Sequence, residues 1–149
     1  SELEAYRDPR LLGVTLGNLA ALDLEEGLPA QARPRLERAQ GLLAQTGDAR
    51  SQAICLARLG AVLASLGHVD EAEARLARAE RLVARRDRAA LRIVQLLRAF
   101  VDLARAASSE GDVARRHHDA ARLRCLAAED AAHGSDDLRT ILRTLRTLL

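Results

Sequence analysis

Apolar residues recur at helical spacing along most of the chain. The clearest stretch, from Ala53 to Ala84, has one apolar stripe on each side of Leu66-Gly67-His68, and each stripe has the width that a packed helix face needs. Gly67 supplies the backbone freedom to reverse direction, and Gly60 and Ala72 are small enough for two antiparallel helices to approach closely. This stretch therefore predicts a helical hairpin.

The same pattern occurs 40 residues earlier in the chain. Its two helices are expected from Pro9 to about Leu24 and from near Pro29 onward. Pro34 would remove a backbone hydrogen bond inside the second helix, so that helix either begins later or bends. The first helix is expected to turn Leu12, Leu16, Leu19 and Ala20 inward. Seven positions match the central hairpin, with Asp23 as the misfit: Leu16, Leu19, Ala20, Gly27, Ala32, Leu36 and Ala39.

A third hairpin follows with a looser pattern. Its first helix is expected from about Arg88 to Ser108, and residues 108–112 form its turn. Gly111 aligns with the central turn glycine only at a shift of 44 residues. That shift places Arg116 and Ala120 at the small and large positions of the second helix. The third copy is therefore a degenerate repeat.

Two further helix starts carry good capping residues. Asp87 precedes the third hairpin, and Ser135 precedes a last helix expected over residues 136–149. The last helix either caps the array or begins another hairpin. Its apolar face is expected to carry Leu138, Ile141, Leu142, Leu145, Leu148 and Leu149.

The central hairpin resembles the tetratricopeptide repeat, a helix-turn-helix unit with large, small and glycine residues at fixed places. The matching residues are Leu56, Leu59, Gly60, Leu63, Gly67, Ala72, Leu76 and Ala79. The long spacing is similar to that in the repeat arms of bacterial multidomain regulators. The resemblance implies one all-α domain, a right-handed α–α superhelix of about seven helices. Its parts would be repeats over about 12–47, 52–86 and 88–132 and a terminal helix over 136–149.

The resemblance also implies function by binding: a protein or peptide would lie in a concave groove lined by the first helix of each hairpin. Transferred by repeat position, the groove residues are Val14, Gly17, Asn18 and Ala21 from the first repeat, Ile54, Ala57, Arg58 and Ala61 from the second, and Arg98, Val101, Asp102 and Arg105 from the third. Several of them are small, so Asn18, Arg58, Arg98 and Arg105 would be the polar contacts.

Composition agrees with an all-helical chain of 149 residues, since no stretch alternates as a strand would. Cys55 and Cys125 lie outside any motif and are expected to be buried free thiols, which fits a reducing cytoplasm. No run is long enough to span a bilayer, and no signal peptide is evident. Because the chain begins without Met and ends within an apolar stripe, we expect it to be a segment of a longer protein.

No catalytic site, metal site or cofactor is expected. His117 and His118 are adjacent and point about 100° apart on a helix, so they cannot hold one metal together. Glu129 and His133 have a usable spacing, but two ligands do not make a site. No nucleophile motif or phosphate loop is present. We therefore expect a binding protein rather than an enzyme.

Two other functions remain open from the sequence. All 23 basic residues are arginines, yet the net charge is only +2, and the aromatic residues that usually stack on nucleic acid are nearly absent. Self-association through the apolar last helix is the second alternative. The arginine stripe that a nucleic acid would use is Arg75, Arg78, Arg81, Arg85, Arg88 and Arg92.

Overall fold

The computed structural model describes residues 8–149, and all regular secondary structure in that range is helical. The all-α class predicted from the sequence is therefore confirmed. Within these residues, no helix combines the length and the apolar character needed to cross a membrane. The helices are α2 Pro9–Glu25, α3 Pro29–Leu43, α4 Ala49–Ser65, α5 Val69–Val83, α6 Arg88–Leu97, α7 Ala99–Ala107, α8 Gly111–Ala132 and α9 Asp136–Leu148.

The hairpins α2–α3 and α4–α5 are copies of each other. Each helix of the second begins and ends 40 residues after its counterpart in the first. Both turns hold a glycine at positive φ, 74° at Gly27 and 88° at Gly67, which other residues adopt only under strain. Both first helices start after an aspartate, Asp8 or Asp48, whose side chain accepts backbone N–H groups. The predicted repetition is thus present in the helices themselves.

Within each hairpin, a buried stripe on the second helix packs against the first helix. A Cβ atom on Gly60 would lie 2.8 Å from Cγ of Leu76 and 3.2 Å from the carbonyl oxygen of Ala72. Only a glycine therefore fits between these two helices, which confirms the predicted close approach. The buried stripes are Ala32, Leu36, Ala39 and Leu43 in α3 and Ala72, Leu76, Ala79 and Val83 in α5.

The third hairpin differs from the other two in both of its helices. The single helix predicted from Arg88 to Ser108 is broken at Arg98 into α6 and α7. In α8, the predicted small position, Arg116, is exposed and the predicted large position, Ala120, is only partly buried. That prediction was wrong because it counted from the turn glycine, and α8 has 22 residues where α5 has 15. The stripe that α8 buries, with the spacing seen in α3 and α5, is Ala121, Cys125, Ala128 and Ala132.

In the first and in the third hairpin, a buried acid joins the two helices of that hairpin. Asp23 of α2 is 6% exposed and accepts a hydrogen bond of 2.5 Å from Arg35 of α3. Asp102 of α7 is 8% exposed and accepts one of 2.7 Å from Arg124 of α8. A buried carboxylate needs such a partner because it has lost its hydration. These contacts are equivalent, since each arginine lies three residues after the first alanine of its buried stripe.

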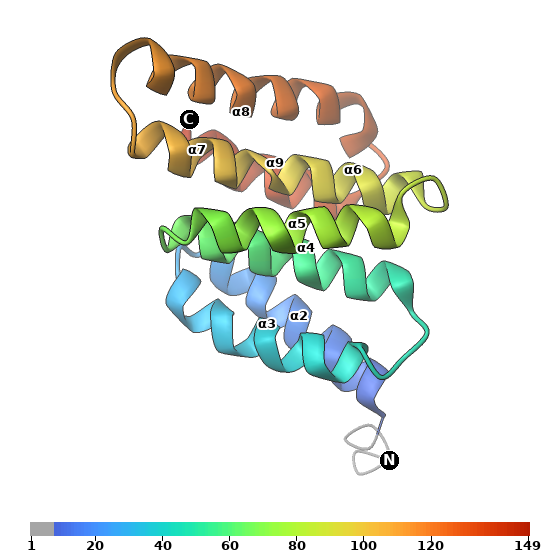
Figure 1. The fold of residues 1–149 in the computed structure, drawn as a ribbon. Coiled ribbons are helices and arrows are strands. Elements are labelled where there is room, and N and C mark those ends of the chain that lie inside the picture. Colours follow the sequence, from blue (N-terminus) through green and yellow to red (C-terminus); the bar gives the residue numbers. More distant parts are fainter. Residues whose placement is uncertain (1–7) are drawn as a thin grey trace.

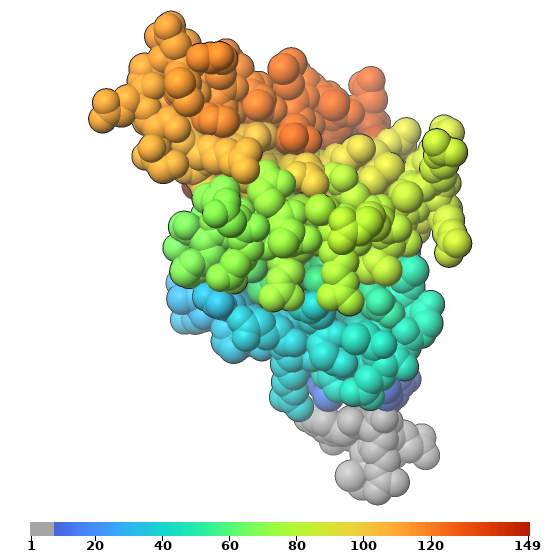
Figure 2. All heavy atoms as spheres, viewed as in Figure 1, coloured from blue at the N-terminus to red at the C-terminus, as the bar shows by residue number. Residues whose placement is uncertain are grey.

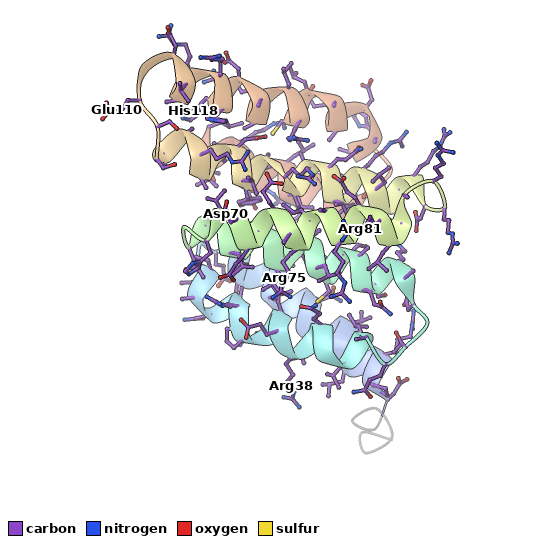
Figure 3. All side chains as sticks on the ribbon, viewed as in Figure 1. Arg38, Asp70, Arg75, Arg81, Glu110 and His118 are labelled. Atoms are coloured by element: carbon purple, nitrogen blue, oxygen red, sulfur yellow. The ribbon has the colours of Figure 1, made fainter. Side chains whose placement is uncertain are left out.

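The central hairpin has the arginine but not the acid. Leu63 stands at the position equivalent to Asp23, so Arg75 lacks the acid that Arg35 meets in the first hairpin. Its guanidinium instead donates to the side-chain oxygen of Gln40 in α3 at 3.1 Å, and Figure 3 shows Arg75 on the α3 side of α5. Asp23, the misfit of the sequence pattern, is therefore the acid that Arg35 meets within its own hairpin.

The hairpins stack in chain order, with α2–α3 at one end, α4–α5 in the middle and α8 at the other end (Figure 1). Figure 2 shows the same order as successive bands of colour. An arginine–aspartate contact crosses each boundary. Arg10 donates to Asp48 at 2.9 Å, and Arg50 donates to both oxygens of Asp87 at 2.9 and 2.7 Å. Because Asp48 and Asp87 are the caps of α4 and α6, these contacts join the starts of successive first helices.

The last helix, α9, returns toward the stack instead of extending it. Ser135 caps it as predicted, accepting from the Leu138 N–H at 3.2 Å. It contacts α8, α6 and α2, and in Figure 1 it lies behind α6 and α7. Leu142 and Leu145 are buried with Leu138, whereas Leu148 is 54% exposed. α9 therefore covers part of the face that the first helices form.

In the first hairpin, one open alternative is decided and one expectation needs correction. α3 begins at Pro29 as expected, with Pro34 inside it, so the alternative of a later start is wrong. Leu19, expected to face inward, is 41% exposed, although its counterpart Leu59 is 1% exposed. The two leucines have the same place on their helices, and they differ because only α4 has a preceding hairpin in the described residues packed against that side.

Candidate ligand-binding cleft

Arg58 occupies the centre of the face formed by the first helices. It lies in the middle of α4, and its side chain is 12% exposed. Gly17 of α2 stands opposite, and a Cβ atom there would be 3.6 Å from Nη1 of Arg58. A methyl group would just touch the guanidinium, and any larger side chain would enter its space. The small residue in α2 thus leaves room for the charged group.

Among the described residues, the carboxylate that pairs with Arg58 comes from α9. Oδ1 of Asp137 lies 3.5 Å from Nη2 of Arg58 and makes an ion pair without a hydrogen bond of normal geometry. Burial lowers the pKa of the Arg58 guanidinium, and the Asp137 charge opposes that shift. Within the described residues, Arg58 therefore has a charge partner but no close hydrogen-bond acceptor.

Two clefts meet at Arg58. The larger, about 210 Å³, lies between α2 and α9, and Phe100 contributes to its apolar wall. The smaller, about 170 Å³, lies between α2 and α4. Each is below the size usual for a small-molecule site but large enough for one or two side chains. The residues that line both clefts are Asn18, Arg58 and Asp137.

The structure divides the predicted groove residues into three groups. Those from the first two repeats that line the clefts are Val14, Gly17, Asn18, Ala21, Ile54 and Arg58. Three others, Ala57, Ala61 and Val101, are at most 2% exposed and lie in the core between helices. The remaining three, Arg98, Asp102 and Arg105, lie elsewhere.

The charged residues of the third repeat face other helices rather than Arg58. Arg98 contacts Glu80 at 2.5 Å and Glu73 at 2.8 Å, both on α5, and Arg105 pairs with Glu73 at 3.2 Å. Burial lowers the pKa of Arg98, but these two glutamates outweigh that effect and raise it. Asp102 binds the α8 arginine described above. The third repeat therefore uses its predicted polar contacts to join neighbouring helices.

α9 supplies several of the cleft residues that the sequence did not identify. Asp137 and Ile141 border the larger cleft together with Thr140 and Thr144. Their helical periodicity predicted an apolar face, but not which surface that face would cover. Leu22 of α2 also borders the cleft and was not among the predicted groove residues. Helix pattern alone carries no signal for contacts between segments this far apart in the chain.

Other groups considered from the sequence have separate surroundings. Glu129 accepts a hydrogen bond of 2.8 Å from Arg146. Nδ1 of His118 is buried without a partner within the described residues, and Figure 3 shows this residue near the start of α8. Of the predicted arginine stripe, Arg75 is half-buried, and the rest are exposed. These groups do not converge on one site with Arg58.

No protein-family model, curated protein or solved structure matches this chain. The chemistry of the Arg58 cleft is therefore the guide to its function.

Proposed function

We propose that this chain is a non-catalytic protein-interaction domain that holds an acidic side chain or a terminal carboxylate of its partner on Arg58. The observation that carries the proposal is the burial of Arg58 and the lack of a close hydrogen-bond acceptor for it within the described residues. Its guanidinium is largely buried, it lines both clefts, and its ion-pair partner among residues 8–149, Asp137, is 3.5 Å away.

A buried guanidinium has lost its hydration and needs hydrogen-bond acceptors in place of water. A charge removed from water is costly unless it is paired and hydrogen-bonded. The planar guanidinium matches a carboxylate, which can accept two parallel N–H groups from it. Asn18 beside Arg58 offers an amide for the remaining polar groups of the ligand, and the apolar wall near Phe100 suits a neighbouring aliphatic side chain.

The wider assignment follows from the repetition of hairpins. Two hairpins with a 40-residue spacing, and a third with the same buried stripe, support a right-handed superhelix of the tetratricopeptide kind. Such arrays commonly expose binding surfaces rather than catalytic groups. We therefore propose a scaffold or sensor role within a cytoplasmic bacterial regulator, with a protein or peptide as the partner.

The test is affinity capture from a lysate of the source cells, with the chain as bait at low and at high salt. Arg58→Gln removes the charge in the cleft. Arg81→Gln is the matched control because Arg81 is exposed on α5 (Figure 3) and lines neither cleft. Asp137→Asn removes the internal acid that competes for Arg58. Circular dichroism of each variant checks that the fold is retained.

We expect the wild type and Arg81→Gln to retain the same partner proteins. Arg58→Gln should lose these proteins, and Asp137→Asn should retain them more strongly. An identical set of proteins on all four baits would contradict a role for the cleft. Nucleic acid held only at low salt, and released by Arg81→Gln, would favour the arginine stripe instead.

A further inference from the structure

The cleft between α2 and α9 is lined by more negative than positive groups. Among residues 8–149, its lining holds one basic side chain, Arg58, and three carboxylates. One carboxylate ends α2, and the other two belong to the first turn of α9. The three acids are Glu25, Asp136 and Asp137. A ligand that carries only negative charge is therefore attracted by Arg58 and repelled by the rest of the lining.

Asp137 uses the same arginine that a ligand carboxylate would use. Within the described residues its carboxylate pairs with Arg58, and its side chain is 49% exposed at the edge of the cleft. Asp136 beside it pairs instead with Arg139, which does not line the cleft. A ligand carboxylate that takes over Arg58 deprives Asp137 of its partner and places a second negative charge near it. A ligand that brings a cation close to its own carboxylate avoids both penalties, because the cation replaces Arg58 as the partner of Asp137.

A free α-amino acid has these two charges at the required short separation, because its ammonium group is on the carbon next to the carboxylate. The carboxylate matches the parallel N–H groups of Arg58. The ammonium has three donors, which suit the carboxylate of Asp137 and the side-chain oxygen of Asn18 in the same cleft. The C-terminal residue of a peptide lacks this ammonium, since an amide takes its place.

The remainder of the cleft suits an aliphatic side chain. The cleft volume is about 210 Å³. Because a water takes about 30 Å³ of the liquid and bonded atoms pack more closely, this is room for roughly ten atoms other than hydrogen, the size of leucine. The apolar groups that line the cleft come from α2, α6, α7 and α9. They are Ala21, Leu22, Leu24, Leu97, Phe100 and Ile141.

We propose that this cleft binds a free aliphatic α-amino acid, with its carboxylate on Arg58 and its ammonium on Asp137. Arg58 keeps the proposed role of carboxylate site, on which this assignment rests, and Asp137 gains the role of recognising the cation. An amino acid and an acidic group of a protein partner would occupy the same arginine, so they compete. The amino acid is then the chemical signal for the proposed sensor role.

Calorimetric titration of the full chain with L-leucine, up to about 10 mM, tests this proposal, because a ligand this small binds in the micromolar to millimolar range. Isocaproate, which is leucine without its amine, and isoamylamine, which is leucine without its carboxylate, are titrated in the same way. This comparison uses the wild type and needs no variant.

Two variants and a matched control assign the charges. Arg58→Gln and Asp137→Asn each remove one half of the internal ion pair. Asp70→Asn is the control, because Asp70 also lies in the first turn of a helix, is exposed on α5 and lines neither cleft (Figure 3). Circular dichroism checks that each variant keeps its fold.

We expect leucine to bind the wild type and Asp70→Asn equally, and each analogue to bind about tenfold or more weakly because one charge is left unmatched. Arg58→Gln should lose leucine. Asp137→Asn should weaken leucine by about tenfold, through loss of the ammonium contact, yet strengthen isocaproate, through loss of the repulsion. Opposite signs for these two ligands are the signature of a site for both charges.

Three results would overturn this assignment. Isocaproate that binds the wild type as tightly as leucine would remove the ammonium site and leave Arg58 as a carboxylate site. Leucine binding that Arg58→Gln does not change would place the amino acid outside this cleft. Absence of leucine binding would exclude the amino acid altogether, and protein capture that depends on Arg58 would then show that the proposed interaction function stands without it.

Discussion

Arg50 in the first turn of α4 donates two hydrogen bonds to the carboxylate of Asp87, whose side chain also caps α6. One aspartate therefore serves the start of its own helix and the boundary with the preceding hairpin. Arg10 and Asp48 repeat the arrangement one hairpin earlier. The hairpins are thus joined by a contact that is built from helix caps.

We predict that Asp87→Ala lowers the free energy of unfolding by about 1 kcal/mol, because it removes the acceptor of the Ala90 N–H at the start of α6. Asp87→Asn keeps a good cap and loses only the charge, so it should lose a few tenths of a kcal/mol, typical of a partly exposed ion pair. Urea unfolding followed by circular dichroism measures both values. Equal losses for the two variants would contradict a separate contribution from the cap.

The two capping acids also predict how stability depends on pH. Hydrogen bonds from the Ser51 side chain and backbone lower the pKa of Asp48, and the backbone N–H of Ala90 and then Arg50 lower that of Asp87. A carboxylate with a lowered pKa stabilises the fold fully above its ordinary value of 3.8 and loses this effect as the pH falls through the folded pKa. The free energy of unfolding should therefore fall below about pH 4. The double variant Asp48→Asn, Asp87→Asn should show a shallower fall.

Two glycine-to-alanine changes should have opposite effects. Gly60→Ala places a methyl group 3.2 Å from the backbone oxygen of Ala72, and backbone of a packed helix cannot move away easily, so we expect a loss of about 1–3 kcal/mol. Gly41 lies in α3, and a Cβ atom there meets nothing within 4 Å. Gly41→Ala should therefore gain roughly 0.5–1 kcal/mol from helix propensity. Thermal unfolding distinguishes the two, and a stabilising Gly60→Ala would refute the close helix contact.

Replacement of Asp23 tests whether the fold needs the buried acid or whether Arg35 only offsets the cost of burying it. We expect Asp23→Leu to be nearly neutral or stabilising, because the central hairpin folds with Leu63 at the same position and the half-buried Arg35 side chain can turn to water. Arg35→Leu leaves the carboxylate of Asp23 buried without its partner and should cost about 1–3 kcal/mol. Chemical denaturation of both variants checks this difference. A severe loss for Asp23→Leu would mean that the acid has a further role.

Cys55 provides a probe for separation of the first two hairpins. Burial raises the pKa of its thiol to about 11, so at neutral pH the reactive thiolate is scarce. In a Cys125→Ala variant, labelling of Cys55 by an aromatic disulfide should be slow and should accelerate as urea weakens the packing of α4 on α3. Rapid labelling in native buffer would show that this boundary opens without unfolding of the whole chain.

The helices and their ends were largely predictable because they depend on neighbouring residues. Caps such as Asp87 and Ser135 act within one turn, and the stripe that contains Leu76 repeats at helical spacing. Gly67 predicted its turn for the same local reason. The degenerate third hairpin was harder, because the extra residues at the start of α8 shift its packed stripe, and a count along the chain cannot detect that shift.

Part of the cleft was predictable as well. Repeat position placed Asn18 and Arg58 on one face, and they do line the same cleft. Repeat position also predicted Arg98 on that face, and this prediction was wrong, because two glutamates of α5 hold its guanidinium. Which acid a given arginine meets depends on how the helices are turned and spaced, which the local pattern does not contain.

The formation of helices, most of their ends and the fixed spacing of two hairpins follow from local sequence alone. Those features arise from backbone hydrogen bonds and side chains within a few residues of each other. The contact of Asp137 with Arg58, the contact of Asp23 with Arg35, and the exposure of Leu19 where Leu59 is buried follow from tertiary packing. Each of these depends on which distant helix packs against a surface, because burial and ion pairing belong to the neighbours in space.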